Sequence, residues 1–148
     1  MKSITYSFSV LLSFLLIMPF MAHAQEEEEI YTVVEQTPQF PGGEKARVDF
    51  IKNNLKYPES ARKNNVEGTV YITFVVEKDG SVTEVEILRG IEENCNKAAL
   101  EVVKSMPKWK PGKQRGKPVR VQFNMPIRFK LQDVKEEAEK NKETKEKH

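Results

Sequence analysis

The sequence is poor in the side chains that most catalytic and metal sites use. It has a single cysteine, Cys95, and two histidines, one within the first 24 residues and one at the last position, His148. A single cysteine excludes a disulfide framework. No pair of histidines or cysteines has the spacing of metal ligands, and no Ser/His/Asp set can be assembled. Nothing in these residues therefore argues for catalysis, and the sequence predicts no metal site.

Nucleotide and nucleic-acid binding are also disfavoured. Gly42-Gly43 and the glycines at 112 and 116 lack the spacing of a phosphate-binding loop. The formal net charge of the 148 residues is +2, which is too small to indicate a nucleic-acid partner. Charged residues make up 31% and hydrophobic residues 39%, a composition typical of one small soluble domain with additional ends.

The first residues have the pattern of a secretory signal. Lys2 supplies a positive charge, residues 8–21 are largely apolar, and Ala22-His23-Ala24 is a small-x-small cleavage site. We predict a signal peptide over 1–24 and a periplasmic mature protein. The alternative is a retained anchor in the inner membrane with the rest of the chain facing the periplasm, because about 20 uncharged residues can span a bilayer.

The most regular pattern in the chain is an alternation over 119–131. The apolar parity consists of Val119, Val121, Phe123, Met125, Ile127, Phe129 and Leu131, and the other parity is polar except for Pro126. A period of two predicts a long strand with one buried face and one wet face. Proline cannot donate a hydrogen bond to a ladder, so Pro126 indicates an edge strand whose even-numbered backbone groups point outward.

A long open edge is a template for a partner's strand. We therefore predict that the protein binds an extended peptide at this edge. The even-numbered residues at its centre are Arg120, Gln122 and Asn124.

Apolar spacing and turn residues predict the remaining elements. They are a helix over 44–54, a short helix over 58–64, a hairpin of strands over 70–76 and 82–88, and a helix that Pro107 ends. Asp79 and Gly80 form the turn of the hairpin. A right-handed final crossover puts the last strand beside the first strand of the hairpin. We predict an α+β fold of two layers, with a three-stranded antiparallel sheet and helices packed on one face.

These elements leave charged segments at both ends of the folded part. We assign 25–37 to a short acidic lead-in, in which 30–34 can form a small strand, and 38–132 to the domain. Residues 133–148 are a charged tail, either a frayed helix or disordered. Cys95 falls on the apolar side of the helix before Pro107, where we expect a buried and inert thiol.

Basic residues without an acidic neighbour fill the stretch over 104–120. They are Lys104, Lys108, Lys110, Lys113, Arg115, Lys117 and Arg120, and Trp109 interrupts them. Such a stretch is suited to an anionic surface. The alternative is a solvated loop in which Trp109 packs against the core and the lysines keep the loop soluble.

Together these residues resemble the C-terminal domain of the TonB energy transducers. The matching residues include Tyr57, Pro58, Asp79, Gly80, Trp109, Pro111 and Gly112, together with a Pro-x-Phe-Pro-Gly-Gly lead-in over 38–43. The resemblance covers 38–132. It implies an α+β domain with a three-stranded antiparallel sheet, no catalysis and no cofactor.

The resemblance also implies partners. In that family the last strand pairs with the TonB box, a short peptide of TonB-dependent outer-membrane receptors, in energy-dependent nutrient transport. The segment before the Tyr-Pro pair helps to contact the box, and here it contains Asn54 and Lys56. A retained anchor would add inner-membrane motor proteins as partners. The alternative function is an anchorless periplasmic adaptor or structural module that docks on an anionic cell-envelope surface through its basic stretch.

Overall fold

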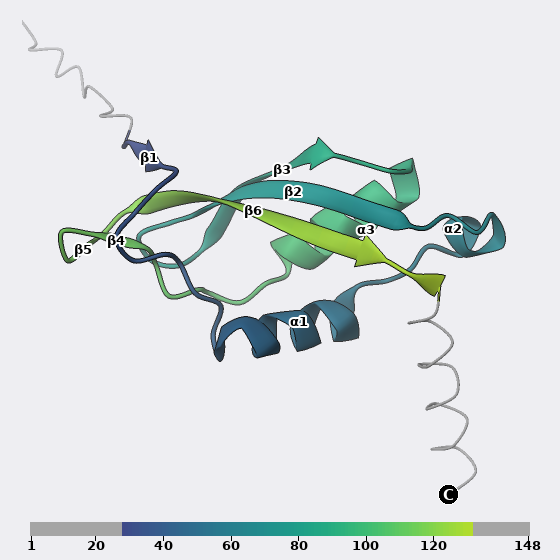
Figure 1. Ribbon diagram of the computed structural model, residues 1–148, viewed down its shortest axis with the longest axis horizontal. Helices are drawn as coiled ribbons and strands as arrows, with labels where there is room; N and C mark the ends of the chain where they lie inside the picture. The colour runs from purple at the N-terminus through teal and green to yellow at the C-terminus, as the bar shows by residue number, and fades with distance from the viewer. Residues whose placement is uncertain (1–27, 132–148) are drawn as a thin grey trace, which may run out of the picture.

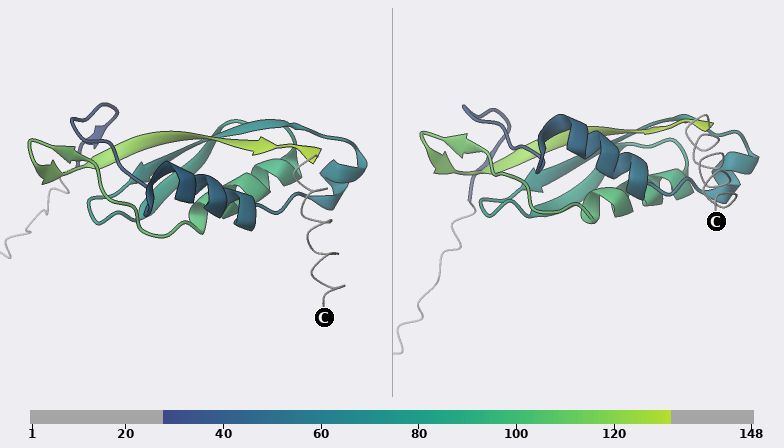
Figure 2. Two further views of the ribbon diagram at one scale, coloured as in Figure 1. Left: turned by 60° about the horizontal axis from the view of Figure 1, so that its bottom comes forward. Right: turned by 90° about the horizontal axis from the view of Figure 1, so that it is seen from below.

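The computed structural model describes residues 28–131, arranged as a four-stranded sheet, a small two-stranded sheet, and helices that lie on one face and along one edge of the larger sheet (Figures 1 and 2). In the larger sheet the order of the strands is β1 (Ile30–Tyr31), β6 (Arg120–Phe129), β2 (Gly68–Val76) and β3 (Val82–Arg89). The predicted signal peptide over 1–24 and the predicted tail over 133–148 lie outside the described residues, as does the start of the lead-in. Within 28–131, no helix is long and apolar enough to cross a membrane.

Three long antiparallel strands confirm the predicted sheet. They are β2 (Gly68–Val76), β3 (Val82–Arg89) and β6 (Arg120–Phe129), with β2 in the middle. On β6 the burial alternates as the sequence predicts: Val121, Met125, Ile127 and Phe129 are buried, whereas Gln122, Asn124, Pro126 and Arg128 are exposed. The apolar parity of this one strand therefore forms much of the sheet's contribution to the core.

Helix α3 (Glu93–Lys104) covers the sheet across β2 and β3. Its buried face consists of Cys95, Ala98, Ala99, Val102 and Val103. The Glu92 carboxylate caps the helix by accepting a hydrogen bond from the Cys95 N–H at 3.1 Å. Cys95 is fully buried, and burial raises the pKa of its thiol to about 11, as expected for an inert cysteine.

Helix α1 (Gly43–Asn54) differs from α3 because none of its residues is fully buried. Ala46, Phe50 and Ile51 pack against the edge of the core, as their spacing predicts. Figure 1 shows α1 running beside β6, on the other side of that strand from β2. The short helix α2 (Glu59–Lys63) follows, with Pro58 at its N-cap.

Strand β1 (Ile30–Tyr31) modifies the prediction that the last strand is an edge. It pairs in parallel with the beginning of β6, Ile30 opposite Arg120 and Tyr31 opposite Val121. The edge is therefore covered up to the N–H of Gln122 and open only from the Gln122 carbonyl onward. A parallel pairing of two residues leaves no periodic signal in the sequence, which is why only a small strand over 30–34, and not its partner, was predictable.

Part of the basic stretch, over 113–118, forms a small hairpin. Strands β4 (Lys113–Gln114) and β5 (Lys117–Pro118) pair across Arg115 and Gly116, which have φ of 51° and 73°. Two central residues with positive φ are typical of a two-residue hairpin turn.

The predicted Asp-Gly turn joins β2 to β3. The Asp79 carboxylate accepts hydrogen bonds from the N–H and the hydroxyl of Ser81, at 2.9 and 2.6 Å. These bonds lower the pKa of Asp79 to about 2, the hydroxyl contributing most. The next residue, Gly80, has φ 87° and lies against the backbone of Trp109, whose N–H donates to the Gly80 carbonyl at 2.8 Å.

Alanine at Gly80 should therefore be much more harmful than alanine at Gly116. Both positions have positive φ, so both variants suffer backbone strain of about 1–2 kcal/mol. At Gly80 the new Cβ would also lie 1.9 Å from the carbonyl oxygen of Trp109. At Gly116 a new Cβ would meet no atom within 4 Å. We expect Gly80→Ala to lower the free energy of unfolding by at least about 3 kcal/mol and Gly116→Ala by about 1–2 kcal/mol, measured by urea denaturation. Equal losses would contradict this packing.

Candidate functional site

The open edge of β6 begins where β1 ends. Pro126 lies directly opposite Tyr71 of β2 in the antiparallel ladder. Because proline has no N–H, this pair is one of the non-hydrogen-bonded pairs, which alternate with hydrogen-bonded ones. Gln122, Asn124 and Arg128 share its parity, so their backbone groups turn away from β2. The parallel pairing of Tyr31 with Val121 already uses the Gln122 N–H, which donates to the Tyr31 carbonyl. The edge therefore offers unpaired groups from the Gln122 carbonyl to Arg128, interrupted by the missing N–H of Pro126.

Two of the three residues predicted at the centre of this edge lie on it. Gln122 and Asn124 are exposed on the face of the sheet that the helices do not cover. The Gln122 amide donates to the Thr73 hydroxyl of β2 at 3.0 Å, which holds its side chain across the sheet.

The third, Arg120, is engaged elsewhere. Its guanidinium donates to the Glu77 carboxylate at 2.8 and 3.1 Å, to Glu84 at 2.6 Å and to the Glu28 carbonyl at 3.2 Å. It thereby ties β6 to β1 and to the β2–β3 hairpin. Hydrogen bonds from Arg120, together with one from Thr83, lower the pKa of Glu77. Arg120 is therefore a structural anchor at the closed end of the edge.

A groove of about 810 Å³ lies between α1 and the C-terminal half of β6. Asn54 and Lys56, the two other residues predicted to contact a peptide, both line it. Its apolar lining consists of Val48, Ile51, Leu55, Tyr57 and Pro126. Its basic lining consists of Arg47, Lys52, Lys56, Arg62, Arg128 and Lys130. The groove opens along the same edge that carries the unpaired backbone groups.

The Tyr57-Pro58 pair shapes one end of the groove. The Tyr57 hydroxyl donates to the Val66 carbonyl, and its ring meets Phe129 edge-on at a centroid distance of 5.4 Å. Pro58 then begins α2, whose Arg62 reaches the groove. The pair thus connects α1 to the end of β6 in a defined geometry.

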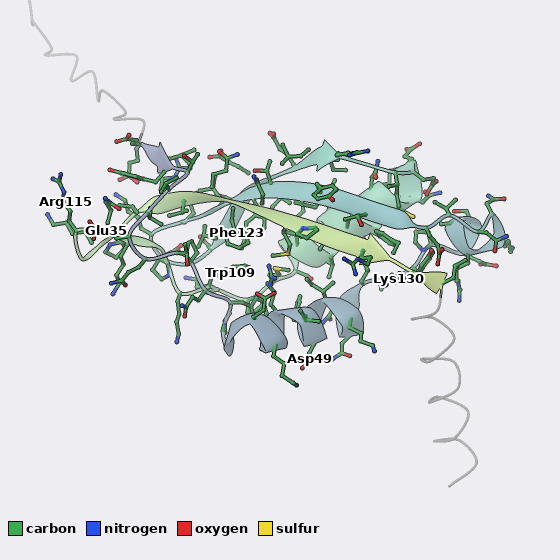
Figure 3. The ribbon with its side chains drawn as sticks, viewed as in Figure 1. Glu35, Asp49, Trp109, Arg115, Phe123 and Lys130 are labelled. Atoms are coloured by element: carbon green, nitrogen blue, oxygen red, sulfur yellow. The ribbon has the colours of Figure 1, made fainter. Side chains whose placement is uncertain are left out.

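Trp109 is a core residue and is 4% exposed. Its ring contacts Phe40, Phe74 and Phe123 at centroid distances of 5.6, 5.6 and 5.2 Å, and Figure 3 shows Trp109 next to Phe123 beneath β6. The alternative in which Trp109 packs against the core is confirmed, and its neighbours Lys108 and Lys110 are exposed. The partly buried Pro111 and the buried Gly112 follow. A Cβ at Gly112 would lie 2.6 Å from a methyl group of Val121, so this turn packs tightly under β6.

Sequence reasoning missed most of the basic lining of the groove. Arg47, Arg62, Arg128 and Lys130 come from α1, α2 and the end of β6, which are far apart in the sequence. Only the placement of α1 beside β6, rather than over the sheet, brings them together. Within 28–131 there is no cluster of His, Cys, Asp and Glu that could hold a metal ion.

The sequence matches known proteins over the region that contains this edge. The model of a family described as "Gram-negative bacterial TonB protein C-terminal" matches residues 53–131. Protein TonB of Helicobacter pylori is 30% identical over 84 residues, 56% of this chain and 28% of that protein. Protein TonB of Vibrio cholerae is 35% identical over 78 residues, 52% of this chain and 32% of that protein. This chain thus spans about a third or less of these relatives.

Solved structures of TonB C-terminal domains are also similar to this chain. The solution structure of the Helicobacter pylori TonB C-terminal domain has a TM-score of 0.46 at 29% identity, over 57% of this chain and 76% of that one. The solution structure of the Pseudomonas aeruginosa domain has a TM-score of 0.42 at 22% identity, over 51% and 77%. The matched family region begins at residue 53, after most of α1.

The ion pair between Arg120 and Glu77 should make stability depend on acid pH. The pKa of Glu77 is lowered from its ordinary 4.5 in the folded protein. The contribution of Glu77 to the free energy of unfolding is therefore complete above that value and is lost as pH falls through the lowered pKa. We expect the free energy of unfolding to fall more steeply below about pH 5 in the wild type than in Glu77→Gln. Urea denaturation between pH 3 and 7 measures this, with Glu101→Gln, an exposed residue of α3, as the control. Parallel curves for wild type and Glu77→Gln would show that the pair contributes nothing.

Proposed function

Because this chain belongs to the family of the TonB C-terminal domain, we propose that it binds an extended segment of a partner protein by strand addition to the open edge of β6. The observation that supports this most directly is the row of unpaired backbone groups from the Gln122 carbonyl to Arg128, beside a groove of about 810 Å³. A strand in that position would complete the ladder of β6 and rest its side chains against α1.

The partner that suits this role is an outer-membrane receptor that carries a TonB box. In this proposal the chain is a periplasmic, non-enzymatic module of energy-dependent nutrient transport, exported through a signal peptide over 1–24. If that segment is retained as an anchor, inner-membrane motor proteins are further partners. The predicted domain over 38–132 contains the edge that both arrangements use.

Backbone pairing alone would give a weak complex. Each ladder hydrogen bond contributes about 0.5–1.5 kcal/mol net, and Pro126 removes one donor from the edge. The side chains of Gln122 and Asn124 point to the open face and should add little. Most of the remaining affinity must come from contacts in the groove, including those of Asn54 and Lys56.

A second candidate function uses the β4–β5 hairpin. Arg115 and Lys117 are exposed at its tip, at the end of the molecule away from Lys130 (Figure 3). The hairpin could dock an anchorless adaptor on an anionic envelope surface. Binding to cell-wall fragments with a steep salt dependence, lost in Lys117→Glu, would favour this function over peptide binding.

Proline at Asn124 tests the proposed edge. Asn124→Pro deletes one outward N–H without removing a hydrogen bond to β2 or to β1, so the domain should stay folded while affinity for a TonB-box-like peptide falls by at least about 0.5–1.5 kcal/mol. Isothermal titration measures the affinity, and far-ultraviolet circular dichroism checks the fold. Asn124→Ala is the matched control and should weaken binding only slightly. A folded Asn124→Pro variant with wild-type affinity would show that the peptide binds elsewhere.

A further inference from the structure

The groove beside β6 has an apolar floor that α1 supplies. Val48 is 51% exposed, and Ile51 and Leu55 are only partly buried, although all three belong to the apolar side of the helix and the turn after it. Helix α1 buries no residue completely along its 12 positions. Its apolar side chains therefore face the groove with part of their surface still exposed to water, which favours a partner that covers them.

The rim of this groove is basic on every side. Lys56 lies after α1, Arg62 on α2, and Arg128 and Lys130 at the end of β6. Among the described residues, no aspartate or glutamate lines the groove. Lys56, Arg62, Arg128 and Lys130 are all exposed, so they present an unbalanced positive charge to whatever enters.

The acidic residues of α1 do not offset this charge. Asp49 pairs with Lys45 at 3.0 Å, and Figure 3 shows it on the side of α1 that faces away from β6. Glu44 pairs with Arg47 at the start of the helix. Both carboxylates are thus engaged within α1.

The other end of the edge has the opposite character. Around Arg120 a smaller concavity is lined by Glu28, Glu29 and Glu84, and Glu84 and Glu77 already bind that guanidinium. The edge of β6 is therefore polarised, acidic where β1 closes it and basic where the groove opens. A strand lying along it experiences this difference from one end to the other.

From this polarity we infer the chemistry of the partner segment, resting on the proposed strand addition: it carries acidic side chains at the end that lies beside the C-terminal half of β6. Apolar side chains at alternate positions of the same segment cover Val48 and Ile51. Because β6 can accept a strand in either direction, the acidic residues precede the paired stretch in an antiparallel complex and follow it in a parallel one. Most of α1 precedes the family match over 53–131, so the apolar floor of Val48 and Ile51 lies outside the matched region, whereas the basic rim lies within it.

Three capped synthetic peptides with one shared apolar, alternating centre test the inference. One has two glutamates at its N-terminal end, one has them at its C-terminal end, and one has glutamines at both. Titration into the purified protein should show one acidic peptide binding about 3- to 10-fold more tightly than the neutral one at low salt, the size expected for two exposed charge pairs. The preference should shrink when salt is raised.

Charge reversal locates the preference. Arg128→Glu and Lys56→Glu should each reduce or abolish the ratio between the acidic and neutral peptides. Arg89→Glu is the matched control, because Arg89 is an exposed arginine at the end of β3, on the opposite edge of the sheet, and the change in net charge is the same. It should leave the ratio as in the wild type.

Chemical shifts of the backbone amides of β6 distinguish the two claims, strand addition to this edge and the preference for acidic side chains. If all three peptides shift the amides of Gln122 and Asn124 and bind with equal affinity, the acidic preference is wrong and strand addition stands. If no peptide shifts them, strand addition is wrong and the inference falls with it. If vesicles of phosphatidylglycerol, but no acidic peptide, shift the amides of Lys56 and Arg128, the groove recognises an anionic surface and the inference is overturned.

Discussion

The ladder between β2 and β6, together with one proline in it, determines which edge of the sheet is available. The two strands pair without interruption from Gly68 opposite Phe129 to Val76 opposite Val121. Pro126 must occupy a non-hydrogen-bonded position of that ladder, and this places the outward backbone groups on the even-numbered residues. The same register directs the odd-numbered side chains into the core. One register therefore positions both the hydrophobic face and the open edge. A slip by one residue would turn the apolar side chains of β6 to the solvent face and the polar ones to the core.

The two ends of that edge are set by different interactions. At the start of β6, Arg120 binds Glu77 and Glu84, and β1 closes the ladder. At the other end, Tyr57 packs on Phe129, and α1 stands away from the strand far enough to leave the groove. Between the two ends, Trp109 packs against Phe123 of β6. The site is thus the part of β6 that has no outer neighbour, between the pairing with β1 at one end and the basic groove at the other.

The long strands, the hairpin turn and the helices were predictable because each leaves a local pattern: alternation over 119–131, Asp79-Gly80, and apolar spacing before Pro107. The even-numbered edge was also predictable, because Pro126 constrains the ladder through its own chemistry. The groove was not. It depends on where α1 rests, and the apolar spacing of Phe50 and Ile51 shows that the helix has a buried side without showing which part of the sheet that side meets. Nor does any pattern join Ile30 to Arg120, because two paired residues are too few to form one.

Hydrogen exchange at the backbone amides of β6 tests the central claim most directly. In the free protein the amides of Phe123, Met125 and Ile127 should be protected by the β2 ladder, whereas those of Asn124 and Arg128 should exchange rapidly. Saturation with a bound extended peptide should protect this second set and leave the first set as it was. Protection of the Asn124 and Arg128 amides in the free protein, or their continued rapid exchange in the complex, would contradict strand addition at this edge.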